Sequence, residues 1–380
     1  MYKSQLKLLA TVASAAETLS LKQVTTGSKL KHTKMVGYWL LGCSGTVAGA
    51  VVLGGITRLT RSGLSMTDWH LIRDMKPPRS HEEWLAEFER YKNFPEFKLA
   101  RSDMTLSEFK SIFHMEWIHR MYGRGVGLAF YLPAMYFWYK GYFGKAMKTR
   151  VLIYGGLILS QGLLGWYMVK SGLKEETAAN TDSPRVSQYR LAAHLGLAFV
   201  VYSGLLWQAL SHILKENAIT CTPQISRIKK FAHTSMTLTF LTAVSGAFVA
   251  GLDGGLVYNS FPKFADQWIP DDLSTIKPWW KNMFENPTTA QFNHRVLAIT
   301  TLSSILVTFA LATPVGLPRR TKIAMNCFLG VGCAQVGLGI ATLLMYVPMH
   351  LAATHQFGSL TLLSMAIWFN HELKSAKVPK

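Results

Sequence analysis

Charged residues are scarce in this chain. Only 16% of its 380 residues are Asp, Glu, Lys or Arg, whereas 49% are hydrophobic, and the mean hydropathy is +0.17. Soluble domains of this total length would carry more charge on their surfaces. Several apolar windows of about 20 residues are long enough to cross a hydrocarbon core of about 30 Å. The composition therefore predicts a polytopic helical membrane protein.

Cysteines are few and are not arranged as ligands. The four cysteines form no CxxC motif, and no two of them share a predicted loop. Cys43, Cys327 and Cys333 fall inside apolar stretches, where a free cysteine behaves as a small buried hydrophobe. We therefore expect neither a disulfide nor a cysteine metal site.

Acidic residues are too few to balance the basic ones: 21 Asp and Glu stand against 40 Lys and Arg, a net charge of +19. In a soluble protein this excess would suggest nucleic-acid binding. Here the basic residues gather in short loops between apolar windows, the pattern that holds a membrane protein in one orientation. We therefore expect a lipid bilayer, and no nucleic acid, as the partner of this charge.

The first 34 residues contain six lysines, one acid and no arginine, and they are rich in Ser, Thr and Ala. Apart from the missing arginines, this composition is typical of a mitochondrial presequence. A basic tail in solvent is the alternative. Residues 1–36 are accordingly predicted to form a matrix N-terminus that includes a presequence.

Apolar windows predict eight membrane spans. The alternation of basic and less basic loops places both termini on the basic side, which is the matrix. The second, fourth, sixth and eighth spans then run inward from the outer face. The spans lie near residues 37–56, 115–139, 150–169, 190–213, 231–251, 291–313, 321–346 and 349–370.

The largest predicted outer loop is 57–114. Its segment HEEWLAEFERYKNF places Trp84, Phe88 and Tyr91 at i, i+4 and i+7, which predicts an amphipathic helix. We expect this helix to lie as a cap on the bilayer surface; a docking face for an electron donor is the alternative.

The two halves of the chain repeat one another in order. An HR pair, a QxxxG stretch and an AAH or AATH stretch occur once in each half. Such self-similarity predicts an all-α fold of two pseudo-symmetric four-helix bundles. The bundles are residues 37–213 and 231–370, joined by a matrix linker at 214–230 and followed by a matrix tail at 371–380.

Each inward-running span carries one histidine at a similar depth: His119, His194, His294 and His355. Facing helices of a four-helix bundle build cofactor sites, and two imidazoles can hold one heme iron. A single intramembrane histidine could be a structural hydrogen-bonder. Polar groups are costly at this depth, so four equivalent histidines favour paired heme ligation.

Arg120 and Arg295 directly follow two of these histidines, near the aqueous face. A heme with its propionates outward needs cations there, and the guanidinium fork suits a carboxylate. The alternative is that both arginines extend to lipid headgroups.

The motifs GGITRLTRSGLSMTDWHLIRDMKPP, EWIHRMYGRGVG, AAHLGLAF, QFNHR and LAATHQFGSLTLL closely resemble the heme A synthase family, in its mitochondrial branch. The resemblance runs from about residue 37 to residue 370. It implies an oxidoreductase that oxidises the C8 methyl group of heme O to a formyl group, giving heme A for cytochrome c oxidase assembly. It also implies His119 and His194, and His294 and His355, as iron ligands, with Glu116 as the essential acid. The cysteine pair that bacterial members carry in the first outer loop is absent from 57–114.

Gln291 occupies in the second half the position of Glu116 in the first, and a glutamine cannot gain or lose a proton at ordinary pH. We therefore expect substrate heme O in the first half and a resident heme B in the second.

The resemblance further implies a place in the mitochondrial inner membrane, with the heme sites toward the intermembrane space. As partners we expect a ferredoxin-like electron donor, heme O synthase, oxidase assembly factors and further copies of the chain in a homo-oligomer. Two other functions fit the histidine pattern: an electron-transfer subunit resembling cytochrome b, and a heme carrier.

Overall fold

The computed structural model describes residues 32–68, 76–173 and 186–375. Within these ranges the regular elements are helices, apart from one isolated bridge between Phe264 and Gln267. The predicted presequence therefore lies almost wholly outside the described residues, as does the end of the predicted tail.

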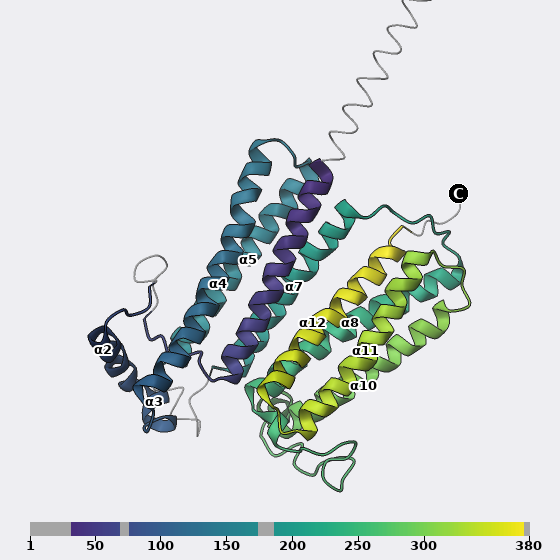
Figure 1. Cartoon of the computed structure of the whole chain (residues 1–380). Coiled ribbons are helices and arrows are strands. Elements are labelled where there is room, and N and C mark those ends of the chain that lie inside the picture. The colour runs from purple at the N-terminus through teal and green to yellow at the C-terminus, as the bar shows by residue number, and fades with distance from the viewer. Residues whose placement is uncertain (1–31, 69–75, 174–185, 376–380) are drawn as a thin grey trace, which may run out of the picture.

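Eight helices of 25 residues or more form the body of the protein (Figure 1). Each contains one of the eight predicted stretches almost entirely. The helices are His32–Leu59, α4 (Leu106–Tyr139), α5 (Lys145–Gly172), α7 (Gln188–Ile213), α8 (Pro223–Gly251), α10 (Pro287–Ala312), α11 (Arg319–Leu344) and α12 (Met349–Leu373).

The largest difference from the predicted spans is at α4, which begins at Leu106 rather than near residue 115. Thr105 and Glu108 form a capping box there, each side chain bonding to the backbone N–H of the other. This exchange satisfies two N–H groups that a helix start otherwise leaves without partners. The extra turns carry α4 past the predicted membrane boundary.

Six of the eight long helices have the length and apolarity to cross a membrane. The other two, α4 and α12, are not among these six; α4 carries Arg124 within its apolar stretch, and α12 carries His355 and Gln356. Large apolar side chains point outward along the helices: Leu152 is 66% exposed and Leu159 is 60% exposed. Such extensive apolar exposure is expected of a surface in contact with lipid. The fold is thus all-helical in its long elements and fits a polytopic membrane protein.

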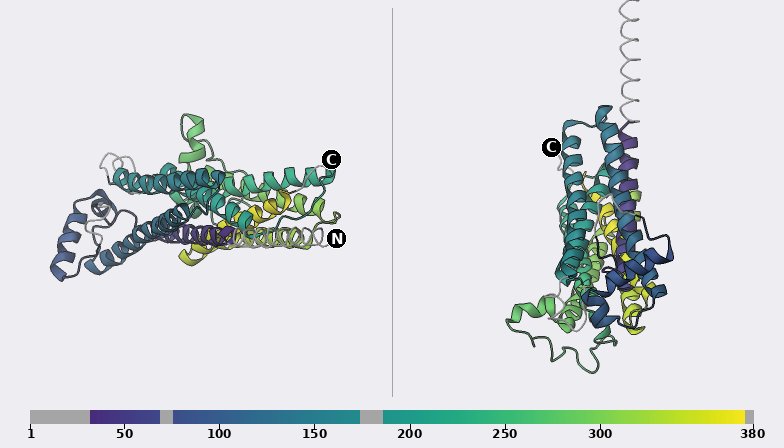
Figure 2. Two further views of the ribbon diagram at one scale, coloured as in Figure 1. Left: turned by 90° about the horizontal axis from the view of Figure 1, so that it is seen from above. Right: turned by 90° about the vertical axis from the view of Figure 1, so that its left-hand side faces the viewer.

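The long helices lie side by side in two groups (Figures 1 and 2). The first group is His32–Leu59, α4, α5 and α7, and the second group is α8, α10, α11 and α12. The groups meet where α7 packs against α8 and α12. Tyr202 Oη and Ser364 Oγ form a hydrogen bond of 2.7 Å across this contact, and Phe199 and Leu363 belong to one buried apolar cluster. The described chain begins and ends at the same end of the helices (Figure 1).

At the opposite end, α2 (His81–Lys92) and α3 (Pro95–Ala100) form a cap against the start of α4 (Figure 1). The apolar face of α2 is buried by protein: Trp84, Phe88 and Tyr91 pack against Phe109 and Phe113 of α4. The predicted amphipathic helix is therefore present, and it forms a cap. Its apolar face packs on α4, whose early start supplies an apolar partner. Its predicted place on the bilayer surface stays a prediction.

A second long connection, between α8 and α10, lies at the same end as the cap (Figure 1). It contains η1 (Gly254–Leu256), η2 (Trp279–Lys281) and α9 (Asn282–Glu285). Asp253 at its start accepts a hydrogen bond of 3.0 Å from Arg58, near the end of the first helix. This ion pair ties the two groups of helices together at the capped end.

Candidate functional site

The four repeated histidines lie toward the capped end of the helices. His194, His294 and His355 are each about two turns from the start of their helices, α7, α10 and α12. His119 is almost four turns into α4, because that helix begins early. All four side chains are only partly buried. Each group of helices thus contributes one pair of imidazoles that the protein does not fully enclose.

Each histidine ring packs on a glycine of the long helix that precedes it in the chain. A side chain on any of these glycines would collide with the imidazole edge or press against it. From a Cβ built on the glycine, the distance to the histidine Cε1 is 3.1 Å for Gly54 and His119, 3.2 Å for Gly165 and His194, 3.2 Å for Gly246 and His294, and 2.8 Å for Gly339 and His355. The same steric arrangement therefore seats all four rings.

The pair in the second group is spaced to hold one metal. The ring centroids of His294 and His355 are 6.4 Å apart, and the ring planes are 86° to one another. Two metal–nitrogen bonds of about 2 Å, each with a ring centre about 1 Å behind its nitrogen, would put the centroids about 6 Å apart. The residues present therefore fit an iron held between two imidazoles. In the first group, His119 and His194 are seated in the same way, on Gly54 and Gly165.

Hydrogen bonds orient one of these rings. Nδ1 of His294 is bonded to Ser245 Oγ at 2.8 Å, and Ser245 donates its own hydrogen to the carbonyl of Thr242 at 2.7 Å. The hydroxyl is thus left to accept from Nδ1–H, which leaves Nε2 as the free lone pair, as in most histidine metal ligands. Nδ1 of His119, His194 and His355 is buried and has no hydrogen-bond partner in the described part of the chain.

The repeated QxxxG stretch positions the last histidine of each half. Gln161 Nε2 donates to the main-chain carbonyl of His194 at 2.9 Å, and Gln335 Nε2 donates to that of His355 at 2.8 Å. The glycine one turn later seats the ring of the same histidine. Neither the glycines nor Ser245 were among the predicted site residues, and the shared QxxxG spacing is the signal that points to two of the glycines.

Glu116 is buried, at 2% exposure. Its Oε1 accepts from Arg120 Nε at 3.1 Å, and its Oε2 accepts from Ser65 Oγ at 2.7 Å and from the backbone N–H of Met66 at 2.8 Å. The carboxylate therefore fastens the segment after the first helix to α4, a role that the sequence did not indicate.

Gln291 holds the equivalent loop of the second group, but with the hydrogen-bond donor and acceptor exchanged. Its Nε2 donates to the carbonyls of Gly254 and Tyr258 at 2.8 and 3.1 Å, and its Oε1 accepts from Arg295 at 3.0 Å. Glu116 accepts from loop donors, whereas Gln291 donates to loop acceptors. The replacement of Glu116 by Gln291 in the second half is thus matched by the loops, which offer hydrogen-bond donors to Glu116 and carbonyl acceptors to Gln291.

Arg120 and Arg295 are both engaged by the outer loops. Arg120 Nη2 donates to the carbonyl of Met66 at 2.9 Å, and Arg295 Nη2 donates to that of Tyr258 at 3.0 Å. Arg295 also lies over the ring of Phe264, 4.0 Å from its centroid. Each arginine thus contacts the loop and also the side chain one turn before it on its own helix, Arg120 to Glu116 and Arg295 to Gln291. Their predicted pairing with heme propionates stays a prediction.

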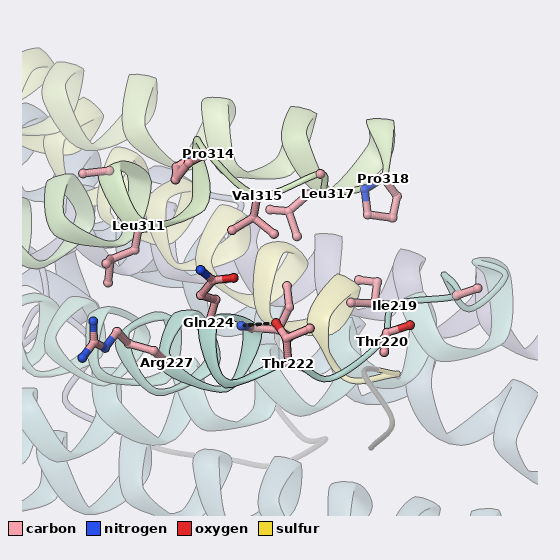
Figure 3. A pocket seen from close by; sticks show the side chains of 14 residues that line it. Ile219, Thr220, Thr222, Gln224, Arg227, Leu311, Pro314, Val315, Leu317 and Pro318 are labelled. Carbon is pink, nitrogen blue, oxygen red and sulfur yellow. Dashed lines mark hydrogen bonds between the residues drawn. The ribbon is translucent and has the colours of Figure 1, made fainter. Parts of the chain in front are cut away.

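A cavity of about 690 Å³ lies elsewhere, between the start of α8 and the turn from α10 to α11 (Figure 3). Thr222, which caps the start of α8, and Arg227 of α8 line it from one side, and Leu311 and Pro318 line it from the other. Arg227 is about 30 Å along α8 from Gly246. This cavity is therefore separate from the histidine sites.

Comparison with known proteins identifies the family of this chain. A profile of the cytochrome oxidase assembly protein family matches residues 37–367. The chain belongs to this family. The match covers all four histidines, Glu116 and the loops that hold it.

Curated relatives in the family are named as heme A synthases. The heme A synthase COX15 of Bos taurus is 60% identical over 347 residues, covering 91% of this chain and 83% of the relative. That of Homo sapiens is also 60% identical, covering 91% of this chain and 84% of its own. The Saccharomyces cerevisiae enzyme is 42% identical over 379 residues, with 93% and 78% covered. The resemblance predicted from the motifs is therefore confirmed.

Proposed function

We propose that this chain is a heme A synthase, an oxidoreductase of the mitochondrial membrane that converts the C8 methyl group of heme O to a formyl group. Substrate heme O binds in the first group of helices between His119 and His194. Heme B resides in the second group between His294 and His355. The observation that carries this assignment is the repeated, glycine-seated histidine pair, which differs between the groups at Glu116 and Gln291.

The reaction needs proton transfer at one site only. The methyl group is oxidised to an alcohol and then to a hydrated aldehyde, which loses water to give the formyl group. Each oxidation inserts one oxygen atom from dioxygen, whose second atom leaves as water after taking two electrons from the donor and two protons. Glu116, beside Arg120, transfers protons in these steps. Gln291 cannot do so. Heme B, when bound, supplies one-electron transfer.

Residues of the chain also shield the first site from bulk water. Gly54 and Gly165 let the rings of His119 and His194 lie against the neighbouring helix backbones. Ser65 and Met66 close the first site toward the cap by binding Glu116. Removing bulk water around a reacting group strengthens the electrostatic effect of nearby charges, here those of Glu116 and Arg120.

The electron donor is a ferredoxin-like protein. A relative from Schizosaccharomyces pombe, 40% identical over 379 residues, is a heme A synthase–mitochondrial ferredoxin fusion protein. The basic loops and both chain ends face the matrix, and the capped end with its histidines faces the intermembrane space. The support for this orientation is the charge of the loops.

Heme extraction tests the proposal. Hemes are extracted with acidic acetone from cells that lack their own heme A synthase, with and without this chain, and are separated by chromatography. We expect heme O alone without the chain and heme A with it. Absence of heme A in both would overturn the proposal. A cytochrome b-like subunit or a heme carrier would leave the heme composition unchanged.

A further inference from the structure

The two histidine sites meet at one step of the first helix, Gly54–Gly55. Gly54 seats the ring of His119, as described above. A Cβ at Gly55 would overlap the side-chain amide of Gln356, which reaches across from α12 in the second group. Two successive glycines thus contact one residue from each group.

Gln356 is fixed in this position by a hydrogen bond. Its Nε2 donates at 2.9 Å to the main-chain carbonyl of Val51, one turn before Gly55. Val51 is 5% exposed, so the bond is shielded from solvent. A side-chain amide at membrane depth needs such a partner, because the surrounding lipid offers none.

Gln356 directly follows His355, whose carbonyl is held by Gln335 and whose ring is held by Gly339. The backbone of α12 at the second site is therefore tied to the first helix one residue from the ligand. A short route runs from His355 through Gln356 to the Gly54–Gly55 step and on to His119.

Among the described residues, the first group has no counterpart of this contact. The residue after His194 is Leu195, which packs against the apolar cluster between the groups and can donate no side-chain hydrogen bond. The repeated fold therefore does not require an amide at this position. The contact belongs to the second site alone.

We propose that Gln356 is a positioning residue that couples the two heme sites by fixing His355 against the Gly54–Gly55 step that seats His119. This inference rests on the proposed function. Groups that orient a heme ligand tune the reduction potential of the iron. A change in the first group at Gly55 therefore alters the heme held by the second group.

The experiment uses the full-length protein in lipid nanodiscs with its resident heme. Gln356→Leu, Gly55→Ala and the double variant are compared by midpoint potential and by low-temperature EPR. Gly55→Ala perturbs this contact directly, because the three atoms nearest to its added Cβ all belong to the side-chain amide of Gln356. Gly45→Ala on the same helix is the control, since a Cβ there meets nothing within 4 Å among the described residues.

We expect both single variants to shift the potential and the g values in the same direction. The double variant should shift them no further, because both changes act through one contact. Gly45→Ala should match the wild type. An unchanged spectrum in Gly55→Ala, or additive shifts in the double variant, would overturn the coupling.

A ligand control separates this failure from failure of the proposed function. His294→Ala and His355→Ala should each abolish the wild-type heme signal. If the signal survives both, the assignment of heme B to these histidines is wrong, and the coupling falls with it. If the histidine variants lose the heme signal as expected but Gly55→Ala leaves the potential and the EPR spectrum unchanged, only the proposed coupling is wrong.

Discussion

Glu116 and Arg120 form an ion pair one turn apart on α4, and the same carboxylate holds Ser65 and Met66 of the adjoining loop. Gln291 and Arg295 repeat this geometry on α10 with an amide in place of the carboxylate. The position therefore has a structural role in both groups of helices. Only in the first group of helices can the side chain at this position, Glu116, exchange a proton.

Glu116→Gln should lower formation of heme A by about 10²- to 10⁴-fold, the usual contribution of a general acid or base. Bound heme per protein should be unchanged, because both histidines remain. The product is measured by chromatography of extracted hemes, and the bound heme by its absorption after extraction into pyridine.

Ser65→Ala is the matched control for the loop contact. It removes one hydrogen bond to Glu116 but keeps the carboxylate and its bonds to Arg120 and Met66. We therefore expect about a tenfold loss of activity, as for one hydrogen bond to a charged group. If Ser65→Ala and Glu116→Gln lose equal activity, Glu116 acts as a loop anchor rather than in proton transfer.

Gly339→Ala should release the heme of the second group. The added Cβ would be 2.8 Å from Cε1 of His355, closer than carbon atoms approach without displacement. Gly337→Ala on the same helix meets nothing within 4 Å in the described ranges and should retain the heme. Heme content per purified protein decides the comparison; equal loading of the two variants would contradict the role of the glycine seat.

Glu96 in the cap should make its stability depend on pH. Burial raises the pKa of Glu96 to about 7, against the opposing effect of Arg101. The folded cap therefore binds this proton more tightly than the unfolded chain, and stability falls as the pH rises from about 4.5 through 7.

Glu96→Gln should remove this dependence while keeping a partner for Tyr91, whose hydroxyl lies 3.1 Å from Glu96. Limited proteolysis of the cap between pH 5 and pH 8 measures the effect. Cleavage of the wild type that does not speed up with pH, relative to the variant, would refute the prediction.

Arg320→Met should destabilise the fold by about 3 kcal/mol, since it leaves a buried carboxylate unpaired. Arg320 Nε bonds to both oxygens of Glu372, at 2.8 and 2.9 Å, and the Glu372 side chain is 0% exposed. Arg319→Met, at an exposed neighbouring position, should have little effect. Thermal unfolding in detergent compares the two, and equal melting temperatures would contradict the assignment.

The long helices could be predicted from sequence because their apolar stretches are continuous. The start of α4 could not, since it depends on the capping box at Thr105 and on aromatic packing against α2. The amphipathic period of α2 predicted a helix correctly. It did not identify the covering surface, which α4 supplies from a distant part of the sequence.

The four histidines were found through the internal repeat, and the family and activity through motifs that the relatives confirm. The seats at Gly54 and Gly246 and the bond from Ser245 depend on which helix faces meet, and one sequence does not contain that information. Arg320 illustrates the same limit: in sequence it is one of several basic residues in a turn, and only the fold directs it to Glu372.

The division of labour between the two groups is tested most directly by analysing the hemes bound to paired histidine variants. His119→Ala/His194→Ala and His294→Ala/His355→Ala are each purified, and their hemes are identified by chromatography and mass. We predict heme B alone in the first double variant, and heme O without heme B or heme A in the second. Heme A on the variant that lacks His119 and His194 would contradict the assignment of the substrate to the first group.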